Sequence, residues 1–248
     1  MNVINYISNL VILLSFNFIN AQKSKLNFPE DFKEISITET QEKYWFSNYS
    51  SYQYTLYTEC GKILVDEVSR VRDKRSWLVD SPDHGILIGV NGGEWLGGLG
   101  KMSLKGIYIH LKENNIKFLH LDSNNRVVLF ELDRFYTKSI LGSLYRNENT
   151  SDLEVKPLAT LDDIPMYIYY NDVEDLYISG LKNLYVYNKK DIIPFFEKGV
   201  WDNIGYSGVR SMMQENSNSD LLIGIEGGII KVNTETREVK LFVLKTLT

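Results

Sequence analysis

Short apolar runs that end in a turn recur along the chain and predict a β-rich protein. Three runs share one pattern, in which three apolar β-forming residues precede a small residue and a turn that closes on Gly or Asn: residues 85–93, 175–183 and 220–228. Their central residues, Ile88, Ile178 and Ile223, are separated by 90 and 45 residues, which gives a period of 45 residues. A degenerate fourth copy is therefore expected near residue 133, close to the apolar run 127–130.

The segments that flank these runs repeat as well. Residues 184–188 and 229–233 each read as a strand that ends on Asn, and residues 209–213 form a further strand before the third copy. One unit thus contains four strands joined by three turns. Because a tight hairpin turn requires positive φ, we expect Gly93, Asn183 and Gly228 to occupy equivalent left-handed positions.

Four antiparallel strands that recur every 40–45 residues or so are typical of a β-propeller blade. The units resemble, more narrowly, the repeats in the periplasmic sensor propellers of bacterial two-component regulators. Residues 209–242 match that pattern best, residues 166–196 next, and residues 79–118 only with an insertion, so the resemblance covers about half of the chain. It implies an all-β, propeller-like fold and no particular activity.

The repeat predicts about five four-stranded antiparallel blades, at residues 30–75, 76–118, 119–162, 163–205 and 206–248. Four blades with an irregular cap are the alternative, because the N-terminal third fits the pattern less well. Residues 137–162 lack clear periodicity and are expected to form a long connection. Residues 65–75 could form a short helix, although they show no sustained 3.6-residue apolar stripe. Trp45, Trp77 and Trp201 each lie near the start of a proposed blade and are expected to be packing residues.

The first 22 residues carry no charged side chain and contain the apolar run 10–16. A short apolar region followed by a small residue is typical of a secretory signal, which predicts cleavage after Ala21 and a single propeller-like domain over residues 22–248. A buried N-terminal strand or helix is the alternative. A retained anchor is less favoured, since Asn17 and Asn20 shorten the run below the roughly 20 residues that a span needs. We therefore expect a secreted or periplasmic protein without a stable membrane span.

Composition narrows the classes of partner. The 248 residues are 44% hydrophobic and carry 27 Lys and Arg against 32 Asp and Glu, for a formal charge of −5. This balance indicates a globular protein and argues against a nucleic-acid partner, which would need a basic surface. The single cysteine, Cys60, rules out an intrachain disulfide; we expect it to be a small buried apolar residue.

The copy at residues 79–118 carries extra residues, 94–106, in the turn between its second and third strands. A tryptophan beside a carboxylate and a lysine, among glycines, suits stacking on a sugar or an aromatic ligand. The candidate ligand-binding residues are Asn91, Glu94, Trp95 and Lys101. The alternative is that Trp95 caps a blade and the insertion only extends a hairpin.

Motifs for catalysis or for a cofactor are absent from the sequence. The glycines around residue 100 fit neither phosphate-binding pattern, and no Gly-x-Ser-x-Gly or His-Glu-x-x-His motif occurs. His110, His120 and Asp122 could meet on neighbouring strands, but their spacing does not support a metal site. We therefore predict no catalytic residue, no metal and no cofactor.

Three classes of function remain. The favoured hypothesis is an exported recognition module that binds a protein, peptide or glycan on its loop-rich face. The alternative is a glycan-active hydrolase or lyase with a site at the propeller axis, since such a site can be assembled from several blades without a linear motif. A third hypothesis is an incomplete ring that a partner closes.

Overall fold

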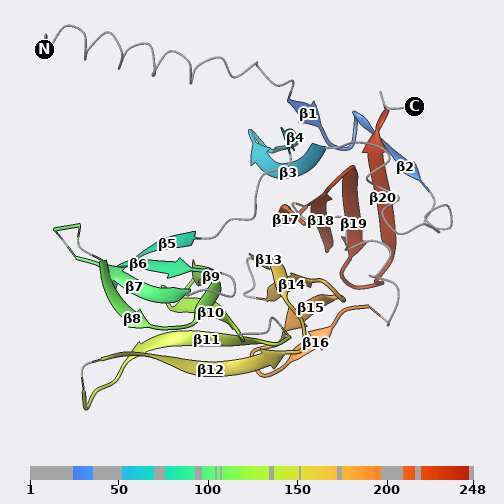
Figure 1. Ribbon diagram of the computed structural model, residues 1–248. Coiled ribbons are helices and arrows are strands. Elements are labelled where there is room, and N and C mark those ends of the chain that lie inside the picture. Colours follow the sequence, from blue (N-terminus) through green and yellow to red (C-terminus); the bar gives the residue numbers. More distant parts are fainter. Residues whose placement is uncertain are drawn as a thin grey trace, which may run out of the picture.

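The computed structural model describes eleven stretches of the chain: residues 25–35, 52–69, 76–92, 97–103, 105–106, 108–133, 137–150, 152–171, 175–196, 209–215 and 219–245. Within them the backbone forms β-strands and no α-helix. All of the strand pairs are antiparallel, and they build five sheets of three to five strands. The predicted all-β, propeller-like array is confirmed (Figure 1).

Three of the sheets contain four consecutive strands each. The β5–β8 sheet comprises β5 (Ser76–Ser81), β6 (Gly85–Val90), β7 (Gly98–Met102) and β8 (Tyr108–Lys112). The β9–β12 sheet comprises β9 (Asn115–Leu121), β10 (Val127–Leu132), β11 (Ser139–Arg146) and β12 (Leu153–Leu161). The β13–β16 sheet comprises β13 (Pro165–Tyr170), β14 (Leu176–Gly180), β15 (Leu184–Tyr187) and β16 (Ile192–Pro194).

The other two sheets share the N-terminal strands. The β17–β20 sheet comprises β17 (Ser211–Gln214), β18 (Asp220–Ile225), β19 (Gly228–Asn233) and β20 (Val239–Leu244), and β2 (Phe32–Ile35) adds to its outer edge. The β3–β4 sheet comprises β3 (Tyr52–Glu59) and β4 (Lys62–Ser69), with β1 (Leu26–Asn27) beside β4. The unit predicted at residues 30–75 is therefore divided between two sheets, because β2 pairs with β20 and only β3 and β4 share a sheet.

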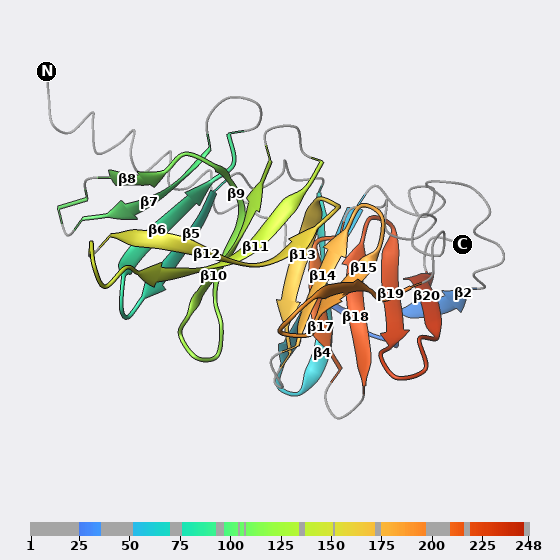
Figure 2. The ribbon, with the colours of Figure 1, turned by 90° about the horizontal axis from the view of Figure 1, so that it is seen from below.

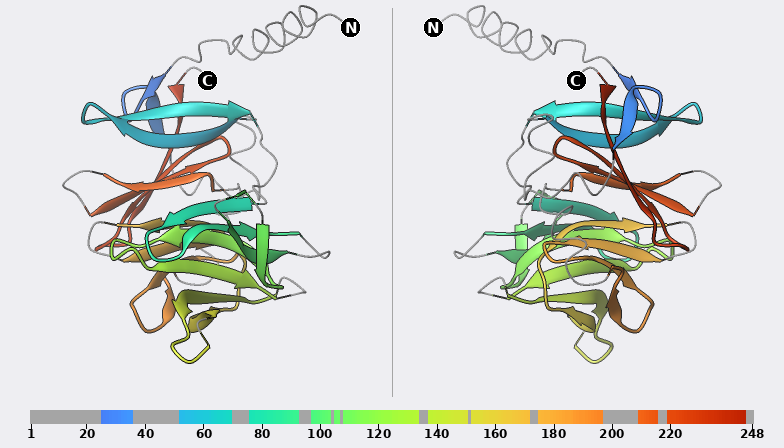
Figure 3. Two further views of the ribbon diagram at one scale, coloured as in Figure 1. Left: turned by 90° about the vertical axis from the view of Figure 1, so that its left-hand side faces the viewer. Right: turned by 90° about the vertical axis from the view of Figure 1, so that its right-hand side faces the viewer.

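The first strand of each sheet lies toward the middle of the array. In Figure 1, β5, β9, β13, β17 and β3 surround the centre, and the later strands of each sheet lie farther out. Seen from below, strands β5–β12 form one half of the molecule and β13–β20 the other (Figure 2). Figure 3 shows β3 and β4 at one end and the β9–β12 sheet at the other.

The 45-residue repeat corresponds to the second strand of the sheets. The three copies found in the sequence are β6, β14 and β18, and the degenerate run 127–130 lies in β10. In the copies at β6 and β18 the small residue is a glycine, and its presence has a steric cause. A Cβ on Gly89 would lie 2.6 Å from Ile116 Cγ2 on β9, and one on Gly224 would lie 2.1 Å from the carbonyl oxygen of Tyr54 on β3. The small residue thus lets the first strand of the neighbouring sheet pass close by.

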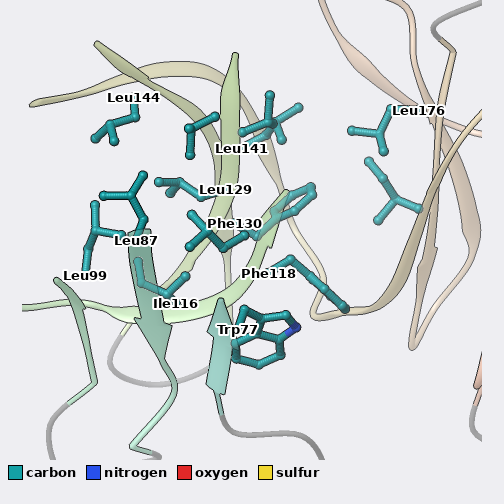
Figure 4. Close-up of a cluster of buried hydrophobic side chains, with 14 of the residues drawn as sticks. Trp77, Leu87, Leu99, Ile116, Phe118, Leu129, Phe130, Leu141, Leu144 and Leu176 are labelled. Carbon is teal, nitrogen blue, oxygen red and sulfur yellow. The ribbon is translucent and has the colours of Figure 1, made fainter. Parts of the chain in front are cut away.

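Strands β14 and β18 are apolar on both faces because each is buried between two sheets, whereas Ile86 of β6 is exposed. Leu221 and Ile223 of β18 pack in the core toward the β13–β16 sheet, while Leu222 packs in the core toward β3. Leu176 and Ile178 of β14 join the core of the β5–β12 half (Figure 4). Burial on both faces explains why the sequence shows continuous apolar runs here.

Three hydrophobic cores connect neighbouring sheets in a row. The first joins the β5–β8, β9–β12 and β13–β16 sheets, the second joins the β13–β16 and β17–β20 sheets, and the third joins the β17–β20 and β3–β4 sheets. Within the described stretches, none of the three holds residues of both the β3–β4 and the β5–β8 sheet. Leu78, on the face of β5 opposite the buried Trp77, is accordingly 64% exposed.

Several expectations about local structure were wrong. Residues 137–162 hold the two long strands β11 and β12 in place of a connection, and Val65 belongs to β4 in place of a helix. Cys60 is exposed, because it forms the β3–β4 turn with Gly61, both at positive φ (52° and 75°). Trp77 is a packing residue as expected, whereas Trp45 and Trp201 lie outside the described residues.

Two of the three predicted left-handed turn positions, Asn183 and Gly228, were also wrong. The positive φ of the β18–β19 turn, 82°, belongs to Gly227 and not to Gly228, which pairs with Ile225 in the ladder. Asn183 does not have positive φ either. Its side-chain amide instead donates to the carbonyl oxygen of Phe196 at 3.0 Å and accepts from the Phe196 N–H at 3.2 Å. Gly93 lies outside the described residues.

A buried carboxylate joins the β9–β12 and β13–β16 sheets. Asp163, 2% exposed, accepts hydrogen bonds from the backbone N–H of Ile164 and of Lys182, each at 2.7 Å, and from the Tyr185 hydroxyl at 3.0 Å. Its own carbonyl oxygen accepts from the Ser139 hydroxyl at 2.9 Å. Its neighbour Asp162 has an exposed side chain and only a long ion pair of 3.6 Å to Lys138. The two adjacent acids therefore have different roles.

Candidate functional site

The structure places two of the four predicted site residues. Asn91 follows the end of β6, whereas Lys101 lies on β7 across from Leu87. Since Val90 pairs with Gly98 at the loop end of the same ladder, the backbone of Lys101 lies roughly 10 Å farther along the sheet. The two side chains thus belong to opposite ends of this strand pair. Glu94 and Trp95 lie outside the described residues, and the site built on them stays a prediction.

The insertion in the copy at residues 79–118 is shorter than expected. The connection between β6 and β7 spans residues 91–97, because Gly98 and Gly100 belong to β7. The Asn115 Oδ1 atom accepts from the Gly92 N–H at 3.1 Å, which ties the connection to β9. The glycines of β7 leave room for two rings of β8, since a Cβ on Gly100 would lie 2.0 Å from the Tyr108 ring and one on Gly98 would lie 2.9 Å from the ring of His110.

A cavity of about 330 Å³ lies where the inner strands converge. Its lining comes from β5, β9, β13 and the residues that lead into β17: Trp77, Lys117, Phe118, Leu119, His120, Met166, Tyr167, Ile168, Val209 and Arg210. Figure 1 shows these four strands around the centre of the array. We call this the axial cavity. Its size and its mainly apolar lining are those of a small-molecule site.

Two β-bulges shape the wall of the axial cavity. On β9, Ile116 pairs with Glu131 and Phe118 with Phe130, so Lys117 is an extra residue without a cross-strand position on β10. On β13, the register shift between Pro165 and Tyr167 leaves Met166 as the extra residue. Bulges re-aim side chains and are frequent beside functional sites. Both extra residues line the axial cavity.

The charged groups in the lining are cationic. Lys117 is only 8% exposed, and Arg210 is half-buried with its backbone N–H donating to the carbonyl oxygen of Gly224 at 2.9 Å. Each of these two side chains also interacts within the protein. The ten lining residues include no Asp or Glu. Among the described residues, the charged side chains of this lining are therefore both basic.

Aromatic rings supply the apolar part of the wall. Trp77 and Phe118 contact each other with ring centroids 5.6 Å apart and a tilt of 57° (Figure 4). Tyr167 enters from β13, and burial raises the pKa of its hydroxyl, so it stays protonated at neutral pH. Flat apolar groups bind well between such rings.

His120 lies at the edge of the axial cavity. Its ring stacks on Tyr170, with centroids 5.0 Å apart and planes 12° from parallel. The pKa of His120 is lowered, chiefly because burial disfavours the charged ring, while nearby Asp122 opposes the shift. His120 is therefore neutral at pH 7, and the charge of the cavity comes from Lys117 and Arg210.

A second cavity, of about 360 Å³, lies on the other side of Tyr170. Its lining includes Asp122 and Arg126, whose Nε donates to Asp122 Oδ2 at 2.7 Å. This cation is thus neutralised within the cavity wall. The axial cavity differs in that the described residues of its lining include Lys117 and Arg210 and no Asp or Glu.

The two histidines considered as metal ligands lie on different sheets, on β8 and β9, and both are exposed. His110 lies against Gly98 of β7, and His120 stacks on Tyr170. Among the residues that the structure describes, no group of three or more His, Cys, Asp or Glu side chains is placed to hold a metal ion. The same part of the chain contains no helix long and apolar enough to cross a membrane.

Sequence reasoning did not find the axial cavity. Lys117 sits between apolar residues of β9, where alternation alone predicts a solvent-facing lysine. Its burial depends on a bulge that has no marker in the residues themselves. Arg210 reaches the cavity only because β13 and β17 are neighbours in the array, which no local pattern reports.

Comparison with known proteins does not identify the chain. No family model matches the sequence, and no curated protein matches it significantly. Solved structures of similar shape include a protein of unknown function from Bacteroides caccae, with 9% identity, coverage of 79% of this chain and 74% of that one, and a TM-score of 0.42. A gluconolactonase from Xanthomonas campestris gives 7% identity, coverage of 91% and 99%, and a TM-score of 0.34.

The extracellular domain of a hybrid two-component system from B. thetaiotaomicron is a further similar structure. It gives 15% identity and a TM-score of 0.41, and the match covers 78% of this chain and 24% of that one. The chain therefore spans about a quarter of the length of that protein. At TM-scores below 0.5, these likenesses assign neither a family nor an activity to the chain.

Proposed function

We propose that this protein is an exported binding module that holds a small ligand in the axial cavity. The observation that carries the proposal is the convergence of two β-bulges on one cavity at the meeting point of four inner strands. A bulge interrupts the ladder of β9 and of β13, and in both cases the extra side chain faces the same space. Binding is favoured over glycan hydrolysis, because hydrolysis needs a pair of carboxyl groups and the ten lining residues supply none.

The Met166→Trp variant tests where the ligand binds. The larger side chain fills part of the cavity from a bulge position, so the sheet ladder is not disturbed. The wild-type protein is screened by ligand-observed NMR against monosaccharides, amino acids, nucleosides and aromatic acids. We expect the compounds that bind to lose at least tenfold in affinity in Met166→Trp.

Leu111→Trp is the matched control. Leu111 is also the extra residue of a bulge, on β8, and it does not line the axial cavity. The Leu111→Trp variant should bind the same compounds as the wild type, with the same affinity. Equal binding by Met166→Trp and the wild type, or no binding by any compound of the screen, would show that the axial cavity is not the site.

Export is part of the same proposal and rests on the sequence. Residues 1–22 are uncharged and hold an apolar run before Ala21. When the full-length chain is expressed in a bacterial host, intact-mass measurement of the periplasmic or secreted protein should give a chain that begins at Gln22. A chain that retains Met1 would contradict export by a cleaved signal.

A further inference from the structure

We propose that the second cavity binds a short zwitterionic peptide of the size of a dipeptide. This site is separate from the axial cavity, so the inference goes beyond the proposed function. Three features of the cavity carry it: hydroxyl groups that face no protein partner in the described part of the chain, a pair of opposite charges, and an apolar part of the wall.

The second cavity lies between two sheets. The β9–β12 sheet and the β13–β16 sheet supply the lining: Asp122, Asn124, Arg126, Val128, Ser143 and Leu158 from the first, and Tyr170, Tyr187 and Lys189 from the second. Where the ladder of β11 and β12 shifts register, Leu158 is the extra residue of a bulge. Together with Val128 it forms the apolar part of the wall.

Three hydroxyl groups in the wall make no hydrogen bond to the described residues, namely those of Ser143, Tyr170 and Tyr187. The hydroxyl of the nearby Tyr185, in contrast, donates to Asp163 at 3.0 Å. Buried tyrosines usually find a partner for the hydroxyl, so three such groups in one cavity indicate a polar ligand. Burial raises the pKa of both Tyr170 and Tyr187, which therefore stay protonated and can donate as well as accept.

The pair of opposite charges is Asp122 and Arg126. The Arg126 guanidinium donates from Nε to Asp122 Oδ2 at 2.7 Å and makes no further hydrogen bond to the described residues. Asp122 Oδ1 accepts from the N–H groups of Asn124 and Arg126 at 2.9 and 2.8 Å, so Oδ2 can accept one more bond. The third charged residue of the wall, Lys189, interacts within the protein.

A zwitterion complements this pair, because its carboxylate can bind the planar edge of Arg126 while its ammonium donates to Asp122. A ligand with a single charge is attracted by one member of the pair and repelled by the other. The cavity therefore favours a ligand that carries both charges.

The three hydroxyl groups favour a dipeptide over a free amino acid. A free amino acid has no uncharged hydrogen-bonding group for them, whereas a dipeptide adds one N–H and one C=O. An aliphatic side chain of the dipeptide can pack on Val128 and Leu158. The volume of about 360 Å³ is near the lower end for ligand sites, which suits a dipeptide better than a longer peptide.

The test compares free and capped dipeptides by isothermal calorimetry with the full chain. Alanyl-leucine and leucyl-alanine are titrated against their N-acetyl forms, which lack the ammonium group, and against their amides, which lack the carboxylate. Each capped form should bind about ten- to a hundredfold more weakly than the free dipeptide, because it loses a hydrogen bond between charged groups.

The hydroxyl groups are tested with Tyr170→Phe and Tyr187→Phe. Each variant should bind the dipeptides about three- to tenfold more weakly. Its melting temperature should equal that of the wild type, because no bond to a described residue is lost. Tyr185→Phe is the matched control: it loses the bond to Asp163 and should melt at a lower temperature, but it should keep the affinity, since Tyr185 does not line the cavity.

The charged pair is tested with Arg126→Gln. This variant should bind alanyl-leucine and its amide with equal affinity, because the partner of the carboxylate is gone. An undiminished preference for the free carboxylate would place the ligand away from Arg126 and overturn the inference.

The remaining outcomes separate this inference from the proposed function. Met166→Trp fills the axial cavity and should leave dipeptide binding unchanged. If Met166→Trp abolishes dipeptide binding while Tyr170→Phe and Tyr187→Phe keep it, the peptide lies in the axial cavity; the inference is then wrong and the proposed function is supported. If neither dipeptide binds, or if free and capped forms bind equally, the inference is wrong, whereas the proposed function still depends on its own screen.

Discussion

The Gly224→Ala variant is expected to lose about 3 kcal/mol of free energy of unfolding. A Cβ at this position would lie 2.1 Å from the carbonyl oxygen of Tyr54 and 2.5 Å from the hydroxyl of Ser211. The Tyr54 oxygen belongs to the backbone of the neighbouring strand β3. That backbone is held in place, because the N–H of Leu56 on the same strand donates to the Ser211 hydroxyl at 2.9 Å. Because the backbone has little room to yield, the added methyl group should separate β18 from β3. Urea denaturation of both proteins gives the difference.

Gly61→Ala is the control for this measurement. Gly61 has a φ of 75° in the exposed β3–β4 turn, and a Cβ there would meet no atom within 4 Å. Its replacement should cost only about 1 kcal/mol, from the unfavourable backbone conformation alone. If Gly224→Ala costs no more than Gly61→Ala, β3 does not pass close to β18 and the proposed contact between these two sheets is wrong.

The Asp163→Ala variant should also lose about 3 kcal/mol of free energy of unfolding. The substitution leaves three part-buried donors without their acceptor, namely the N–H groups of Ile164 and Lys182 and the hydroxyl of Tyr185. Each buried donor that loses its acceptor costs about 1–3 kcal/mol. Partial access of water to the vacated space keeps the cost of each donor at the lower end of that range. Thermal unfolding followed by circular dichroism measures the loss.

The adjacent acid provides a matched comparison. Asp162 is exposed and its ion pair with Lys138 is long, so that Asp162→Ala should change the free energy of unfolding by less than about 0.5 kcal/mol. Similar losses for the two variants would contradict the distinct roles that the hydrogen bonds assign to these neighbours.

The repeat made the architecture predictable from the sequence. Runs such as 221–225 are apolar at consecutive positions, and a 45-residue spacing between such runs leaves room for one four-stranded sheet each. In β14 and β18 this pattern is set by burial between two sheets, whereas β6 is fully buried on one face only. The small residue at Gly89 and Gly224 is likewise a shared consequence of the neighbouring inner strand.

Local turns and long strands were harder to predict, because they depend on partners distant in the sequence. Residues 139–161 form two strands although they show no clean alternation, since Gly142 lies against Val155 at the register shift of their ladder. The turn after β18 uses Gly227 for positive φ, and two consecutive glycines gave no means of choosing between them. The prediction of a four-stranded unit at residues 30–75 was wrong, because β2 pairs with β20 at the far end of the chain.

The candidate site could not be predicted for a related reason. The sequence drew attention to a tryptophan in a connection, whereas the axial cavity is formed by residues of separate sheets whose local patterns are ordinary. Lys117 is a lysine in an apolar strand and Met166 follows a proline, and only the bulges place them on one wall. A site assembled from single residues of four strands leaves no linear motif.

A crystal structure of the mature protein grown with a compound that binds in the ligand-observed NMR screen tests the central claim most directly. We expect the ligand in the axial cavity, in contact with Met166 and with the ring of Trp77 or Tyr167. A ligand bound in the connection between β6 and β7 would contradict the proposed site. So would a structure in which β9 and β13 lack their bulges and the side chains of Lys117 and Met166 point away from the centre of the array.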